Sequence, residues 1–246
     1  MNYINSGPKK AAITGLGAYV PKHKLTNADL EKMVDTNDEW IFARTGIKER
    51  RILKGQHKPT SFMAIKAAKK LLRKKNIAPR GIDMVIVATI TPDMYVAATA
   101  AQVASEIGAV NAFAYDIQAA CSGFLYGMST ASSMIASGRY KKVLLIGADK
   151  MSSIVDYEDR ATCIIFGDGA GAVVVEERKS QEDGEIFSFV NGLSSDKLDI
   201  LEVPNFGSAM DRFNKDEAAR VRWTFDGQEI FKGGIRAMAT ASDEVI

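Results

Sequence analysis

The sequence predicts a layered α/β fold in which helices pack on a sheet. Short apolar runs typical of strands alternate with longer segments in which apolar residues recur three or four positions apart. With 246 residues, 46% of them hydrophobic, the chain can bury the core of one large domain or of two smaller ones. We therefore expect an α-β-α layered architecture.

The order of the elements supports this fold. Strands are expected at residues 11–15, 84–89, 112–117, 143–147 and 163–176. Helices are expected at residues 27–34, 36–45, 60–75, 96–106 and 122–137, the first two preceded by the N-cap residues Thr26 and Asp35.

The amino-acid composition of the chain changes after residue 179. Residues 1–10 form a polar lead-in, and residues 11–179 carry the alternating elements. Residues 176–183 are charged, and residues 191–216 are rich in Gly, Ser, Asn and Asp, which is typical of a linker and loop region. A second unit, with an extended segment and a helix from about Asp226, is expected to begin near Val221. We find neither an internal repeat nor a low-complexity tract.

Composition excludes several function classes. The 32 basic and 30 acidic residues leave a formal charge of +2, which favours neither nucleic acid nor a membrane surface as a partner. Two cysteines without a Cys/His cluster predict no metal site and no disulfide framework, and they fit the cytoplasm. The first ten residues lack the apolar core of a signal peptide.

Cys121 is the most informative residue. It lies between an expected buried strand, residues 112–117, and an expected helix that ends near Gly138. Unpaired N–H groups and the positive dipole end at a helix start stabilise a thiolate, so the position suits a nucleophile. A buried structural cysteine is the alternative on position alone. Cys163, in an apolar run, is expected to be structural.

Several motifs follow one another along the chain. They are residues 26–30, 38–41 and 44–51, Ala-Ala-Cys-Ser-Gly at 119–123, and residues 159–162 and 166–172. Taken in this order, the motifs resemble the β-ketoacyl-acyl-carrier-protein synthase III family of the thiolase superfamily, which initiates type II fatty acid synthesis. The resemblance runs from about Ala11 to the last residue.

The resemblance implies an acyltransferase in which Cys121 takes an acyl group from a short acyl-CoA such as acetyl-CoA. The acyl group then passes to the carbanion that malonyl-acyl carrier protein forms when it loses CO2. It also implies that the backbone N–H of the cysteine forms part of the oxyanion hole. No prosthetic group is implied, because acyl-CoA is a substrate.

Basic residues point to an anion site, formed by Arg44, Lys48, Arg50, Arg51 and Arg160. Trp40 precedes Arg44 by four residues, which places both on one helix face. A solvated basic helix with a half-buried tryptophan is the alternative from spacing alone. The family resemblance implies instead that Trp40, Arg44 and Arg160 flank the adenine of coenzyme A.

Further roles rest on the resemblance. It implies a pantetheine tunnel lined by Phe225, Gly227, Gln228, Phe231 and Gly234. Ordinary helix packing is the alternative for these five. Lys232 matches a position implicated in docking the acidic carrier protein. Val96 stands where many relatives have a phenylalanine that closes the acyl pocket from the partner subunit.

The glycines of residues 167–172 resemble a phosphate-binding loop, but a strand follows them where a nucleotide fingerprint needs a helix. We therefore expect no dinucleotide. These glycines are expected to let the backbone pack closely, with Asp168 in a local hydrogen-bond network.

The sequence departs from the family in one respect. The family's Cys-His-Asn triad takes its histidine and asparagine from segments that do not occur here, and the only histidines are His23 and His57. We therefore expect a chain truncated at its C-terminus, with the N-terminal thiolase-like half complete and condensation more impaired than acylation.

Two alternatives to an initiating synthase remain. One is an acyl-CoA-binding or interaction fragment that cannot condense, and the other is a thiolase-superfamily synthase with a different acyl-CoA substrate, such as a hydroxymethylglutaryl or polyketide starter enzyme. The resemblance further implies a homodimer, with residues 112–117 at the two-fold axis.

Overall fold

The structure is a computed structural model that describes residues 9–179, 184–186, 188–193, 198–203 and 223–245. The chain forms two compact units. Unit 1 comprises Met1–His23, Arg51–Lys150 and Asp168–Phe187, and unit 2 comprises Lys24–Arg50, Met151–Gly167 and Ser188–Ile246. Most of the expected lead-in, and part of the loop region that follows residue 179, lie outside the described residues.

Unit 1 is built on a six-stranded sheet in the order β5-β4-β6-β7-β1-β8. Its strands are β1 (Ala11–Tyr19), β4 (Met84–Ala88), β5 (Phe113–Ile117), β6 (Lys142–Lys150), β7 (Asp168–Glu177) and β8 (Gly184–Glu185). Strand β4 is parallel to β5 and β6, whereas β7 is antiparallel to both β6 and β1. The sheet is therefore mixed, with its parallel part at the β5 edge.

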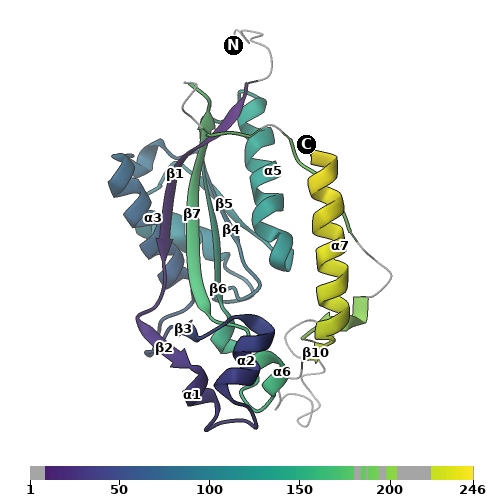
Figure 1. Ribbon diagram of the computed structural model, residues 1–246. Coiled ribbons are helices and arrows are strands. Elements are labelled where there is room, and N and C mark those ends of the chain that lie inside the picture. The colour runs from purple at the N-terminus through teal and green to yellow at the C-terminus, as the bar shows by residue number, and fades with distance from the viewer. Residues whose placement is uncertain (1–8, 180–183, 187, 194–197, 204–222, 246) are drawn as a thin grey trace. The chain divides into compact units, whose positions relative to one another are not determined.

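Helices cover both faces of this sheet (Figure 1). Helices α3 (Thr60–Lys75) and α4 (Thr99–Ile107) pack on one face, and α5 (Gly123–Ala136) packs on the other. Every residue of β4 is buried, as expected for a parallel strand between two helical layers. The α-β-α layers match the fold class that the sequence predicts.

The core between the sheet and helices α3 and α4 is aliphatic. Alternate residues of the strands, such as Val85 and Val87 of β4 or Leu144 and Ile146 of β6, meet buried residues of α3 and α4. The polar exception is Asp116 of β5, which accepts hydrogen bonds from the backbone N–H groups of Thr99 and Ala100 at 2.7 Å each. Its carboxylate thereby caps α4, whose own N-cap residue makes no side-chain bond.

Unit 2 consists of several short elements and one long helix, the 19-residue α7. They are α1 (Asn27–Leu30), α2 (Asp38–Thr45), η3 (Met151–Ser153), α6 (Arg160–Cys163), η4 (Leu198–Ile200), β9 (Leu201–Glu202), β10 (Thr224–Phe225) and α7 (Gly227–Val245). Strands β2 (His23–Thr26) and β3 (Glu49–Ile52) pair where the chain passes between the units. The remaining turns, η1 (Pro79–Gly81) and η2 (Ala120–Ser122), belong to unit 1. No helix in the described part of the chain is long and apolar enough to cross a membrane.

Several expected elements need correction. The strand expected at 163–176 is wrong in its first half, because Asp159 caps a helical turn over Arg160–Cys163 and the strand begins only at Asp168. Asp35 does not cap the second helix. Asn37 does so, with its side chain accepting a hydrogen bond from Trp40 N. Helix α3 has the predicted bounds.

Close packing of α3 on the sheet depends on Gly17 of β1. A Cβ atom at Gly17 would lie 2.6 Å from the carbonyl oxygen of Ala67, which is helix backbone and cannot move aside. By contrast, a Cβ atom at Gly171 of β7 would meet no atom within 4 Å. The two strand glycines therefore differ in the space around them.

We predict that Gly17→Ala lowers the free energy of unfolding by about 1–3 kcal/mol, the usual cost of overpacking. The matched change Gly171→Ala should leave it within about 0.5 kcal/mol, as for substitutions without a steric conflict. Chemical denaturation followed by far-UV circular dichroism measures both. Equal effects of the two changes would contradict the packing argument.

Candidate active site

The parallel strands of unit 1 end at one edge of the sheet. Ala88 of β4 is in register with Ile117 of β5 and with Gly147 of β6. Open α/β sheets bind ligands at the carboxyl ends of their parallel strands. Cys121 follows Ile117 by four residues and thus lies at this edge.

Cys121 lies in a tight turn that leads from β5 into α5. Ala120 has a positive φ of 42°, which L-residues other than glycine adopt at a cost. The η2 turn over Ala120–Ser122 follows, and Ser122 N donates to Ala119 O at 3.0 Å. The thiol of Cys121 is exposed. An exposed thiol on a strained turn at a helix start fits a nucleophile better than a buried structural cysteine.

Small residues hold the start of α5 against the sheet. A Cβ atom at Gly127 would lie 2.6 Å from Cδ1 of Leu145, and a Cβ atom at Gly147 would lie 3.2 Å from Cδ2 of Phe124. The helix therefore packs on β6 at a distance that larger side chains would not allow. This close packing sets the position of the turn that carries Cys121.

Asp149, near the end of β6, organises the neighbouring loop after β4. Its Oδ1 atom accepts hydrogen bonds from the Thr89 hydroxyl at 2.9 Å, Ile90 N at 2.8 Å and the Thr91 hydroxyl at 3.1 Å. The Thr91 hydroxyl is also 2.8 Å from Lys150 N, which donates to it. The loop that begins here carries Val96, whose side chain is 98% exposed.

Unit 2 contains an aromatic and guanidinium cluster formed by Trp40, Arg44 and Arg160, which we call the ring clamp. The Cζ atoms of Arg44 and Arg160 lie 4.3 Å and 5.1 Å from the centroid of the Trp40 ring. Arg160 also donates from Nη1 to Asp35 O at 3.0 Å. The structure thus brings together the three residues that the sequence assigned to adenine binding. Flat guanidinium and indole groups stack on planar rings.

The other basic residues of the expected anion site are not part of the ring clamp. Arg50 is 3% exposed, and its guanidinium donates to Ile164 O and to Asn27 Oδ1, so the expectation that it binds an anion is wrong. Lys48 pairs with Asp38 at 2.9 Å, and Arg51 donates to Pro21 O at 3.0 Å. Of the five basic residues, Arg44 and Arg160 are the two whose guanidinium groups lie over the Trp40 ring.

The residues expected to line a pantetheine tunnel lie in β10 and α7 of unit 2. Phe225 packs edge-on against Phe166, with ring centroids 6.3 Å apart. A Cβ atom at Gly227 would lie 3.0 Å from the Phe225 ring, whereas one at Gly234 would meet nothing within 4 Å. Gln228 is exposed and Phe231 is 68% exposed. Lys232 is exposed and lies 3.3 Å from Glu229.

Two sequence expectations concern structural residues of the middle region. Cys163 is fully buried, and burial raises the pKa of its thiol, with Asp159 adding to the effect. Asp168, at the start of the glycine-rich stretch, is buried and its Oδ2 atom accepts a hydrogen bond from Leu53 N at 2.7 Å. Both observations agree with the structural roles expected for these residues.

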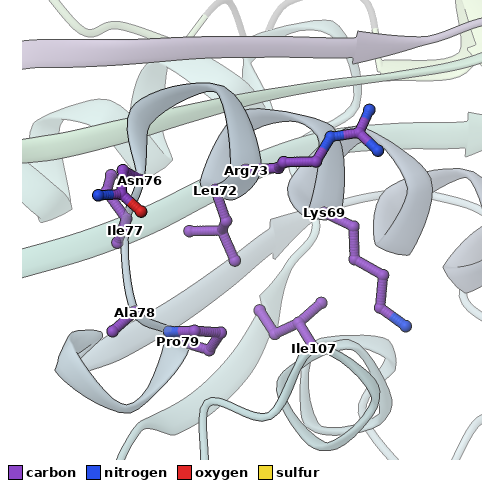
Figure 2. Close-up of a pocket in the computed structure, with 8 residues that line it drawn as sticks. All are labelled: Lys69, Leu72, Arg73, Asn76, Ile77, Ala78, Pro79 and Ile107. Carbon is purple, nitrogen blue, oxygen red and sulfur yellow. The ribbon is translucent and has the colours of Figure 1, made fainter.

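A surface cavity of about 590 Å³ lies between the C-terminal ends of α3 and α4 (Figure 2). Leu72 and Ile107 point into it, and Lys69 and Asn76 lie at its margin. Both helices lead into the N-terminal ends of parallel strands, β4 and β5. The cavity therefore lies at the opposite edge of the sheet from Cys121 and takes no part in this site.

Sequence reasoning did not identify the hydrogen-bonded roles of Asn27 and Asp38 in unit 2 and of Asp149 in unit 1, and it assigned Arg50 to an anion site. Arg50 binds Ile164, which is 114 positions away, and Asp149 binds Thr89, which is 60 positions away. Asn27, Asp38 and Arg50 carried a usable signal, because all three lie in motifs that the family resemblance quotes.

The layered fold and an exposed cysteine at the parallel strand ends define a thiolase-like acyltransferase. The family model of 3-oxoacyl-[acyl-carrier-protein (ACP)] synthase III matches residues 115–194. The chain belongs to the β-ketoacyl-acyl-carrier-protein synthase III family, the initiating condensing enzymes of fatty acid synthesis.

Relatives of known name support this assignment. The chain is 47% identical over 238 residues to the β-ketoacyl-[acyl-carrier-protein] synthase III of Chlorobium chlorochromatii, covering 96% of this chain and 72% of the relative. It is 48% identical to the enzyme of the same name from Phocaeicola vulgatus, covering 93% of this chain and 68% of the relative.

Solved structures agree. The crystal structure of 3-oxoacyl-[acyl-carrier-protein] synthase III from Aquifex aeolicus matches with a TM-score of 0.84 and 43% identity, covering 96% of this chain and 70% of that one. The priming β-ketosynthase of the R1128 polyketide pathway matches with a TM-score of 0.89 but only 28% identity. The match covers 99% of this chain and 71% of that one.

We predict that a thiol reagent such as iodoacetamide labels Cys121 in the native protein and leaves Cys163 unlabelled until the protein is denatured. The first thiol is exposed, whereas the second is buried and has a raised pKa. Peptide mass spectrometry after timed labelling measures this. Equal labelling rates of the two cysteines in folded protein would contradict the assignment of the exposed nucleophile.

Proposed function

We propose that Cys121 is the nucleophile that takes an acyl group from a short acyl-CoA, and that the ring clamp holds the adenine of that coenzyme. The observation that carries the proposal is the exposed thiol on the strained turn before α5. It is supported by the ring clamp of unit 2, in which the guanidinium groups of Arg44 and Arg160 lie over the indole of Trp40.

In the first stage the Cys121 thiolate attacks the thioester carbonyl of acyl-CoA. A carbon–sulfur bond to Cys121 forms, the bond to the coenzyme A sulfur breaks, and the coenzyme leaves as a thiolate that takes up a proton. The oxyanion of the tetrahedral intermediate needs preorganised donors, and the backbone N–H of Cys121 is one of them. The helical turn that follows adds the positive end of its dipole.

In the second stage the acceptor is malonyl-acyl carrier protein. Loss of CO2 leaves a carbanion that attacks the acyl carbonyl, and the Cys121 thiolate departs, which gives a 3-oxoacyl-acyl carrier protein. Lys232 is an exposed cation on α7 and is proposed as a contact for the acidic carrier protein. Phe225, Gly227, Gln228, Phe231 and Gly234 are proposed to line the path of the pantetheine arm.

We further propose that the enzyme is a homodimer that pairs through β5. This strand lies at the edge of the sheet, and its Phe113 is 42% exposed. The ring of Phe113 stacks on that of Tyr115, with centroids 6.4 Å apart. The centroid of the Phe113 ring lies 5.2 Å from that of the Tyr140 ring. An edge strand with exposed aromatic residues is a surface that a second copy can cover.

A second candidate function is acyl holding without condensation. It needs only the exposed Cys121 thiol and the ring clamp, both of which lie within the described residues. The polyketide starter alternative has less support, because the named synthase III relatives are 47% and 48% identical whereas the priming ketosynthase is 28% identical.

We predict that acetyl-CoA adds an acetyl group to Cys121, as measured by intact-protein and peptide mass spectrometry. Cys121→Ser should abolish the adduct, and the matched change Cys163→Ser should leave it nearly intact. A chase with malonyl-acyl carrier protein separates the two candidate functions, because discharge to product shows condensation and a persistent adduct shows acyl holding. An adduct that maps elsewhere in folded protein would refute the assigned nucleophile.

We predict that Arg160→Ala weakens coenzyme A binding by about 1–3 kcal/mol, the typical cost of losing a charged hydrogen-bond partner. Isothermal titration calorimetry measures the dissociation constant. The control is Arg80→Ala, which removes an exposed arginine of unit 1 far along the chain from the ring clamp. Similar affinities for the two variants would remove Arg160 from the proposed site.

A further inference from the structure

Arg50 is a buried cation whose partners in the described residues are neutral. Its side chain donates from Nε to Ile164 O at 2.7 Å, from Nη2 to the same oxygen, and from Nη1 to Asn27 Oδ1. Burial lowers the pKa of its guanidinium group. Burying a charge costs free energy unless the charge is hydrogen-bonded. The hydrogen bonds of Arg50 are therefore needed to keep its charge in the interior.

Asn27 is the second member of this arrangement and is also buried, at 2% exposure. Its Nδ2 group donates to Asp38 Oδ1 at 2.7 Å and to Ile47 O at 2.9 Å. Asp38 is the first residue of α2, and Ile47 follows the residue that caps its C-terminus. One amide group therefore holds both ends of α2.

Arg50 reaches the other helix of the ring clamp. The carbonyl group of Ile164, which accepts two of its N–H groups, belongs to the residue immediately after α6. Helix α2 carries Trp40 and Arg44, and α6 carries Arg160. The buried bridge from Ile164 through Arg50 and Asn27 to Asp38 thus connects the two helices that supply the ring clamp.

These helices need such a connection. Helix α2 has eight residues and α6 has four, and helices of these lengths are not stable in isolation. Arg160 and Trp40 are 120 positions apart in the sequence, which leaves their spacing to tertiary contacts. Because a ring is held between two flat groups only at the correct separation, a small shift of either helix weakens the ring clamp.

We propose that Arg50 and Asn27 are positioning residues for the adenine site, acting through α2 and α6 and not by touching the coenzyme. This inference rests on the proposed function of the ring clamp. The buried bridge through Arg50 and Asn27 thus contributes to binding and not only to the stability of the core. The bridge sets the separation of Trp40 and Arg160.

Two thioesters separate positioning from a general structural role. Acetyl-CoA carries the adenine nucleotide that the ring clamp holds, whereas acetyl-pantetheine has the same reacting thioester without it. Loss of positioning should therefore slow acylation of Cys121 by acetyl-CoA and leave acylation by acetyl-pantetheine unchanged. A merely structural loss would slow both reactions alike.

The first variant is Arg50→Lys, which keeps a cation but loses the fork that binds two groups at once. We expect the dissociation constant of coenzyme A to rise about 10-fold or more, in keeping with the cost of small misplacements. The rate of acylation by acetyl-pantetheine should stay within about 2-fold of the unmodified chain. Calorimetry and timed mass spectrometry measure the two quantities.

The second variant avoids the buried core. Asp38→Ala removes the acceptor of the Asn27 amide from a side chain that is 50% exposed. Its matched control is Glu39→Ala, which removes an exposed carboxylate from the same first turn of α2 without breaking the bridge. We expect Asp38→Ala, and not Glu39→Ala, to lower the preference for acetyl-CoA over acetyl-pantetheine. This pair decides the question if Arg50→Lys does not fold, as judged by circular dichroism.

The outcomes are distinct. If the unmodified folded chain neither binds coenzyme A nor acylates Cys121, the proposed function fails. If that chain prefers acetyl-CoA and the Asp38→Ala variant keeps the same preference, the positioning role is overturned while the proposed function stands. Equal losses with both thioesters in Asp38→Ala would also overturn it, since they would show a structural role only.

Discussion

The close contact between α5 and the sheet is the constraint on which the position of the proposed nucleophile, Cys121, depends. At Gly127 and Gly147 the helix and β6 approach so closely that an added Cβ atom would lie 2.6 Å from Leu145 and 3.2 Å from Phe124, which positions the start of α5 against the sheet. The chain must then turn sharply after β5, and Ala120 takes a left-handed conformation to do so. The strain is localised at the residue before Cys121, which keeps the thiol exposed at the end of the parallel strands.

The two units are stabilised by different interactions. Unit 1 relies on burial of apolar surface between a sheet and two helical layers, and the carboxylates of Asp116 and Asp149 near the strand ends accept hydrogen bonds from the neighbouring loops and helix start. In unit 2 the short helices α2 and α6 are connected by a buried arginine and a buried asparagine. A directional hydrogen-bonded bridge can set a spacing between two helices that a small apolar core would leave loose.

This division fits the chemistry of the family. Acyl transfer needs a nucleophile whose backbone donors stay in place during the reaction, which a rigid layered core supplies. In the proposed function, a large coenzyme is held by flat groups on short helices, Trp40 and Arg160, which a planar ring can approach. The relatives carry more chain than the matched part, since the alignment covers 72% and 68% of the first two.

The sequence by itself determined the fold class, the bounds of α3 and the identity of Cys121 as the candidate nucleophile. Hydrophobic periodicity and local motifs are properties of neighbouring residues, and they can be read without knowing the fold. It also singled out Trp40, Arg44 and Arg160, through the order of family motifs. It failed at residues 163–167, where the apolar run predicts a strand but the cap formed by Asp159 starts a helical turn.

Only the tertiary structure decided what the buried polar groups do. Arg50 was expected to bind an anion, because it is one of several cationic residues that lie close together in the sequence. In the structure its charge is turned inward to Ile164 and Asn27, which are 114 and 23 positions away in the sequence. Contacts between distant segments depend on how the chain packs as a whole, and no local pattern records them.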